Sequence, residues 1–147
     1  MATYPVFLSH SWVEQDGVER ITSLMETYRL KTEDFAYEYY SVSKDDPAQF
    51  LPSNKALSLS IEKQMEPCCC LIILAGVFEE FKRWTNLELD AAKKLGLPVI
   101  LVEAVDPKHT SHKEKRAAAE IVKWDAMQLG DAIVKHARPG KVLKQTT

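Results

Sequence analysis

Hydrophobic and polar positions follow one another along the chain in a pattern that predicts five strands separated by helices. The longest uninterrupted apolar run covers residues 68–75, between Pro67 and Gly76. Such a run is typical of a strand with two buried faces, so we expect it at the centre of a sheet. Shorter apolar or aromatic segments predict further strands at residues 4–8, 35–40, 98–102 and 121–124.

Between these strands the apolar positions recur every three or four residues, which predicts amphipathic helices. The first covers residues 13–28, the second begins at a cap on Ser53 or Asn54 and ends at Met65, the third ends at Gly96, and the last covers residues 126–136. Residues 113–120 form a short helix or turn. In the last helix we expect Met127, Ile133 and Val134 to be the buried anchors.

Regular alternation with short connections favours right-handed crossovers and an open parallel sheet with helices on both faces. We expect one domain over residues 1–137 and a flexible tail over residues 138–147. In such sheets a ligand binds beyond the carboxyl ends of the strands, where the strand order reverses. Residues 9–12, residues 41–47 and the start of the helix that holds Trp84 are predicted to meet at that edge.

Glu88 is the unusual residue of the third helix. The stripe expected to face the sheet contains Phe81, Trp84, Leu87, Ala91 and Leu95. Glu88 lies inside the same arc, where a carboxylate loses hydration. Such a residue is either a rim glutamate paired with a lysine or arginine, or a group placed for chemistry.

The composition of the chain excludes several classes of protein function. The 147 residues carry a formal net charge of −2, with 27% charged and 46% hydrophobic residues, so the basic excess of a nucleic-acid binder is absent. No segment resembles a signal peptide or a membrane span, and we expect a cytoplasmic protein. The three cysteines are consecutive within one strand, which favours buried free thiols over a disulfide or zinc site.

Several chemistries found on parallel α/β sheets lack their residues here. The loop after the first strand has neither the acidic residues of a phosphoryl-accepting receiver domain nor the glycines of a flavin phosphate loop. The dinucleotide and nucleoside triphosphate fingerprints are also absent. His109 and His112 have no clear third ligand, so we expect no metal site.

Four segments together resemble a known family. They are Phe-Leu-Ser-His-Ser-Trp at residues 7–12, Tyr-Ser-Val-Ser-Lys-Asp-Asp-Pro at 40–47, Leu-Ala-Gly at 74–76 and Trp-Thr-Asn-Leu-Glu at 84–88. In this order and spacing they resemble the TIR-like proteins of the bacterial Thoeris antiphage defence system. The resemblance implies a flavodoxin-like three-layer sandwich with a central parallel five-stranded sheet.

The resemblance also implies an activity. Enzymatic TIR domains cleave the bond between nicotinamide and ribose in NAD⁺ with a glutamate four residues after a tryptophan, which here is Glu88. Thoeris members join the ADP-ribose to itself, and a separate effector protein senses the cyclic product. NAD⁺ is then a substrate and no cofactor is expected. A phage-derived trigger and a homo-oligomer are further expectations, and neither nucleic acid nor membrane is an expected partner.

The resemblance assigns Glu88 as the catalytic residue, because a fixed carboxylate stabilises the positive charge that develops on ribose. The expected substrate-binding residues are Ser9, His10, Ser11, Trp12, Lys44, Asp45 and Trp84. The serines would hold the diphosphate or ribose, Trp12 would stack on a ring, and the charged pair would belong to a lid. The alternative roles are a helix cap for the serines, a solvated loop for the charged pair, and core packing for Trp84.

Two other functions fit the same sequence. One is a TIR-like binding module that assembles with itself or a partner without turnover, and the other is a sensor that holds NAD⁺ without cleaving it. The sequence leaves the choice between cyclisation and hydrolysis open, because both outcomes follow the same cleavage.

Overall fold

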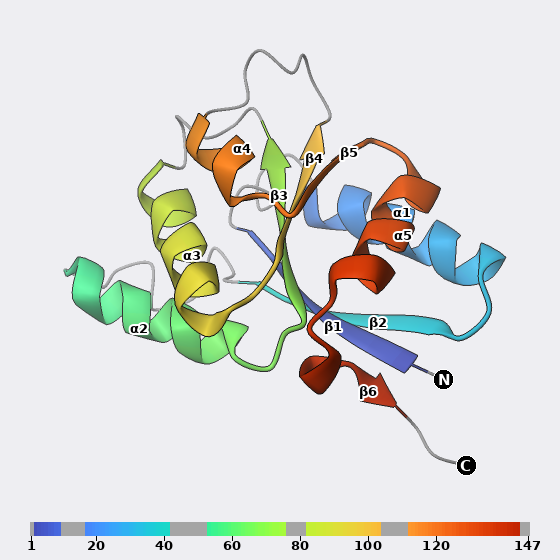
Figure 1. Cartoon of the computed structure of the whole chain (residues 1–147), viewed down its shortest axis with the longest axis horizontal. Coiled ribbons are helices and arrows are strands. Elements are labelled where there is room, and N and C mark those ends of the chain that lie inside the picture. Colours follow the sequence, from blue (N-terminus) through green and yellow to red (C-terminus); the bar gives the residue numbers. More distant parts are fainter. Residues whose placement is uncertain (1, 10–16, 42–52, 76–81, 104–111, 145–147) are drawn as a thin grey trace.

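A computed structural model of the chain has a sheet between two layers of helices (Figure 1). It describes residues 2–9, 17–41, 53–75, 82–103 and 112–144. Its elements are β1 (Ala2–Leu8), α1 (Gly17–Lys31), β2 (Phe35–Tyr40), α2 (Asn54–Met65), β3 (Cys70–Ala75), α3 (Lys82–Leu95), β4 (Val99–Glu103), α4 (His112–Ala117), β5 (Glu120–Lys123), α5 (Ala126–His136), the 3-10 helix η4 (Pro139–Lys141) and β6 (Leu143–Lys144).

The strand order confirms the predicted flavodoxin-like fold. The sheet runs β2-β1-β3-β4-β5 with every neighbouring pair parallel, and β6 pairs antiparallel with the beginning of β1. The order reverses between β1 and β3, where Val6 is opposite Cys70 and Leu8 is opposite Ile72. The carboxyl ends of these two strands therefore form the edge at which a ligand is expected.

Each face of the sheet has its own apolar core. Val6 and Leu8 of β1 pack into the cluster that also contains buried residues of α1 and α5. Phe7 points to the other face and packs into the cluster that contains buried residues of α2 and α3. Because side chains alternate along a strand, Ser9 returns to the face of Phe7, which is the side that α3 covers.

The helix and strand ends follow local signals. The bounds of β2 and α5 coincide with the predicted ones, and Ser53 caps α2 by accepting a hydrogen bond from the backbone N–H of Ala56 at 3.1 Å. Gly96 takes the left-handed conformation, with a φ of 70°, just after α3. None of the described helices is long and apolar enough to cross a membrane.

The expected anchors of α5 are partly wrong. Ile133 is fully buried, but Met127 and Val134 are 41% and 44% exposed. The buried face instead contains Leu129 and Ala132, which lie four residues and one residue before Ile133. Met127 and Val134 are bulky and apolar, but helical spacing places Leu129, Ala132 and Ile133 together on the face that packs against the core.

We expected a flexible tail at residues 138–147, but residues 138–144 are ordered. This segment forms η4 and β6, and β6 extends the sheet beside β1. The backbone N–H of Arg138 donates to the carbonyl oxygen of Cys69 at 3.0 Å, and its guanidinium donates to the carbonyl oxygen of Leu95. These backbone acceptors lie far away in the sequence, so no local pattern of residues indicates them.

All three cysteines are buried free thiols, as predicted. Burial, together with the neighbouring Cys69, raises the pKa of Cys68 from 9.0 to about 12. The pKa of Cys70 is also raised, through its hydrogen bond with Cys69 and through burial. Cys68 and Cys70 are therefore neutral at physiological pH, and neither is suited to react or to bind metal as a thiolate.

We expect the thiols to react only after unfolding. At pH 8 Ellman's reagent should label the native protein at a small fraction of the rate seen in denaturant, where three thiols become available. Because the folded pKa of Cys68 is raised, its contribution to stability is complete below pH 9 and is lost as pH rises from 9.0 to about 12. Urea unfolding at a series of pH values measures this decline, and rapid labelling of the native protein would contradict the burial.

Candidate active site

Ser9 and Glu88 meet at the edge where the strand order reverses. The hydroxyl of Ser9 donates a hydrogen bond to Oε1 of Glu88 at 2.6 Å, and both residues are fully buried. Ser9 directly follows β1, and its backbone N–H donates to the carbonyl oxygen of Ile72 in β3 at 3.0 Å. The pair therefore connects both strands of the switch point with α3.

The buried stripe of α3 is centred closer to Glu88 than the sequence predicts. The most buried side chains of the helix are Thr85, Glu88, Leu89, Ala91 and Ala92. By contrast, the apolar residues Trp84, Leu87 and Leu95 are only partly buried at the border of the core. Polar and small residues thus occupy the middle of the α3 face that packs on the sheet. The large apolar residues lie along one border of this face, so a prediction based on them is rotated around the helix relative to the observed buried face.

The hydrogen bond from Ser9 offsets part of the free-energy cost of burying the Glu88 carboxylate. A carboxylate without water is costly unless hydrogen bonds replace its hydration, and a short bond from a hydroxyl to a carboxylate is among the stronger ones. The bond also fixes the direction of the Glu88 side chain relative to the sheet. The arrangement is preorganised, because α3 and the β1–β3 pair hold the two partners from opposite sides.

Ser9 was predicted to contact the substrate, and that role stays a prediction. Its hydroxyl already donates to Glu88, and the residue has no exposed surface. The described geometry gives Ser9 a different part in the site, which is to orient the carboxylate. The sequence contains no signal for this contact, because 79 positions separate the two residues.

We expect Ser9→Ala to lower the free energy of unfolding by about 1–3 kcal/mol, because it removes a hydrogen bond from a buried carboxylate. Urea denaturation measures the change. The control is Ser23→Ala on the exposed side of α1, which should change stability by less than about 0.5 kcal/mol. Equal effects of the two substitutions would mean that the bond to Glu88 contributes no net stability.

Trp84 lies one turn before Glu88 on α3. It is partly buried and packs against the core cluster shared by α2, α3 and the sheet. This position fits the predicted core role, since the ring supports the helix that carries the carboxylate. Its role in substrate binding stays a prediction.

The remaining predicted substrate-binding residues lie outside the described residues. They are His10, Ser11 and Trp12 after β1, and Lys44 and Asp45 after β2. Their assignments stay predictions.

The structure adds buried polar groups that sequence reasoning missed. Glu114 of α4 is fully buried, and Thr85 of α3 is 1% exposed with no hydrogen-bond partner for its Oγ1 among the described residues. At the end of β4, Glu103 pairs with Lys123 of β5 at 3.0 Å. The short α4 has too few residues for a periodic pattern, so its buried carboxylate had no sequence signal. Within the described ranges no group of three or more potential metal-ligating side chains occurs.

Comparison with known families agrees with the fold. A model of the TIR-like domain of Thoeris protein ThsB matches residues 7–109, a range that includes Ser9, Trp84 and Glu88. A search of curated proteins finds no match. Because the family model covers more than half of the chain and the strand order is flavodoxin-like, the chain belongs to the Thoeris ThsB family of TIR-like defence proteins.

Proposed function

We propose that this protein cleaves the bond between nicotinamide and ribose in NAD⁺ and converts the ADP-ribose into a cyclic isomer. The observation that carries the proposal is the fully buried carboxylate of Glu88, fixed by Ser9 at the β1–β3 switch point. Membership of the ThsB family supports it. The product would act as a messenger on a separate effector protein.

The chemistry explains why a buried carboxylate is useful. Departure of neutral nicotinamide leaves positive charge on the ribose, as in glycoside cleavage. A carboxylate in a site without water stabilises that charge much more strongly than one in solution. Glu88 would supply the charge, and Ser9 would keep its Oε1 in place while the other oxygen faces the sugar.

Complete burial also has a consequence for regulation. Glu88 has no exposed surface in this structure, so NAD⁺ reaches it only after the residues that cover it move apart. We therefore expect low activity in the resting protein and activation by a trigger produced during phage infection. Self-association is one means by which a trigger would open the site, and light scattering with and without the trigger measures it.

The same observation favours a second candidate function. A carboxylate without access to solvent is also what a TIR-like binding module would contain after losing turnover. Such a module would capture a partner or a second copy through its surface, and Glu88 would only stabilise the fold. The two functions differ in whether nicotinamide is ever released.

The deciding experiment incubates the purified protein with NAD⁺, with and without a lysate of phage-infected cells. We expect triggered release of nicotinamide, measured by liquid chromatography, together with an ADP-ribose product. Mass spectrometry distinguishes the cyclic product from linear ADP-ribose, which is heavier by one water. Absence of nicotinamide release with active trigger, together with partner capture that survives Glu88→Gln, would favour the binding module.

A further inference from the structure

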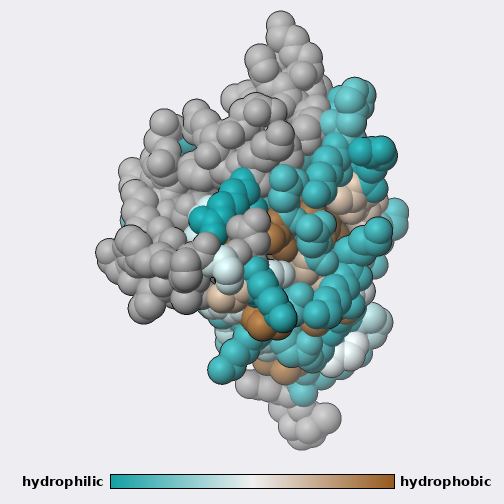
Figure 2. Space-filling view, turned by 90° about the vertical axis from the view of Figure 1, so that its left-hand side faces the viewer, coloured by the Kyte–Doolittle hydropathy of each residue, from teal (hydrophilic) through white to brown (hydrophobic). Residues whose placement is uncertain are grey.

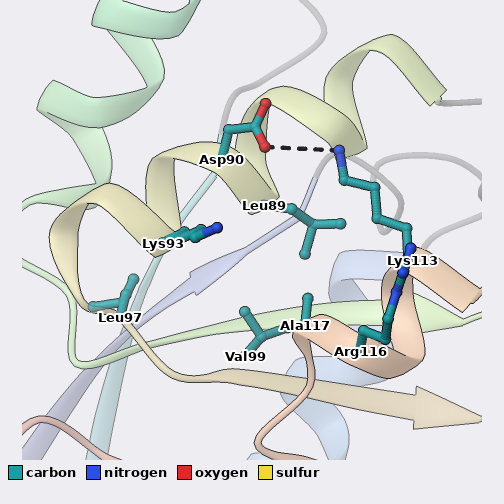
Figure 3. Close-up of a pocket in the computed structure, with 8 residues that line it drawn as sticks. All are labelled: Leu89, Asp90, Lys93, Leu97, Val99, Lys113, Arg116 and Ala117. Carbon is teal, nitrogen blue, oxygen red and sulfur yellow. Dashed lines mark ion pairs between the residues drawn. The ribbon is translucent and has the colours of Figure 1, made fainter.

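A cavity lies between α3 and α4, on the flank of α3 that faces away from α2 (Figure 3). Its volume is about 410 Å³, which is within the range of small-ligand sites in proteins. The residues that line it are Leu89, Asp90, Lys93, Leu97, Val99, Lys113, Arg116 and Ala117.

The cavity has an apolar floor and charged walls. The floor consists of Leu89, Leu97, Val99 and Ala117, and the first three of these are nearly fully buried. Figure 3 shows Lys93 on the α3 side and Lys113 and Arg116 on the opposite α4 side. The side of the molecule that carries α2 and α3 likewise has hydrophobic surface enclosed by hydrophilic residues (Figure 2).

Positive charge exceeds negative charge at this cavity. Asp90 is the one acidic residue among the described residues that line the cavity, and it pairs with Lys113 at 3.7 Å. Within the described ranges, Lys93 and Arg116 form no ion pair. Two cationic side chains, one from each wall, are therefore available to an anion that enters between the helices.

We propose that the cavity binds a nucleoside phosphate. A flat apolar ring would cover the floor of Leu89, Leu97 and Val99, because burying such surface is favourable. The phosphate would accept hydrogen bonds from Arg116 and from Lys93, since arginine and lysine are the usual phosphate donors. The volume of about 410 Å³ suits a mononucleotide and leaves a whole dinucleotide largely outside.

This cavity is separate from the Glu88 site. The Glu88 carboxylate is turned toward Ser9 at the end of β1, whereas Leu89 and Asp90, the next residues on α3, face the cavity beside α4. A ligand held by both helices would restrain the helix that carries the carboxylate. That regulatory consequence rests on the proposed NAD⁺ cleavage, but the binding itself does not.

The test measures binding of AMP to the whole chain carrying Glu88→Gln, so that turnover plays no part. Isothermal titration calorimetry should show saturable binding, and adenosine without phosphate should bind at least about tenfold more weakly, because it lacks the charge-assisted hydrogen bonds to Lys93 and Arg116. Methyl NMR should show the shifts on Leu97 and Val99. Failure to bind AMP at millimolar concentration would overturn the inference.

Matched variants locate the site. Lys93→Ala combined with Arg116→Ala should weaken AMP binding at least about tenfold, and Ala117→Phe, at an exposed position, should block the cavity. Lys115→Ala, on the same helix but outside the cavity, should leave binding unchanged. Unchanged AMP binding in the double variant would place the ligand elsewhere. AMP binding without NAD⁺ cleavage in the unmodified chain would refute the proposed function and leave this inference standing.

Discussion

Glu88→Gln should lower the rate of triggered NAD⁺ cleavage by at least about a hundredfold, because it removes the charge that stabilises the cationic ribose. The amide has nearly the same shape and still offers an oxygen to the Ser9 hydroxyl, so the fold should survive. Nicotinamide release measures the effect, and thermal unfolding checks that the variant is folded.

The matched control for this prediction is Glu114→Gln. Glu114 is also fully buried, but it lies on α4 and is not the glutamate that follows Trp84. The same chemical change at this second carboxylate should leave most of the activity. If Glu88→Gln is as active as the unmodified protein, Glu88 is a structural residue. If Glu114→Gln alone is inactive while folded, the chemistry belongs to α4.

Gly130→Ala should destabilise the protein by about 1–3 kcal/mol, although alanine is the better helix former by about 1 kcal/mol. A methyl group at Gly130 would overlap the ring of Tyr28 on α1. That ring has little freedom to move. It packs edge-on against Phe35, with 4.8 Å between the ring centroids, and its hydroxyl donates a hydrogen bond to Asp131 at 2.9 Å. Urea denaturation measures the loss.

A control and a double variant separate this overlap from general helix effects. Nothing lies within 4 Å of a methyl group at Gly140, so Gly140→Ala should be nearly neutral. In a Tyr28→Ala background, where the ring is gone, Gly130→Ala should cost much less than in the natural background. Equal costs in both backgrounds would show that the contact of α1 with α5 is not the cause.

The sequence predicts most of the fold because strands and helices here have different and regular periods. The buried run of β3, the aromatic β2 and the Ser53 cap each depend on neighbouring residues, and each was found as predicted. The segment after residue 137 was missed because its partners, such as the carbonyl of Cys69, lie about 70 positions away. Contacts between residues so far apart produce no periodic pattern in the sequence.

The candidate site was only partly predictable. Helical spacing identified Glu88 as a carboxylate on the wrong face, and family resemblance attached a reaction to it. The bond with Ser9 depends on the register of β1 against β3 and on how α3 crosses them, which spacing alone does not specify. The burial of Glu114 has no sequence signal because its helix has 6 residues, fewer than two turns, which is too short for a periodic pattern.

The alternation of Phe7, Leu8 and Ser9 along β1 limits which sequence changes this defence protein can tolerate during evolution. Substitutions in the strand can preserve the site, but gain or loss of a single codon between Phe7 and Ser9 would exchange the two faces of the strand. An aliphatic side chain would then confront Glu88 while a hydroxyl entered the opposite core. Length variation among related defence proteins should therefore accumulate in the connections and spare this strand.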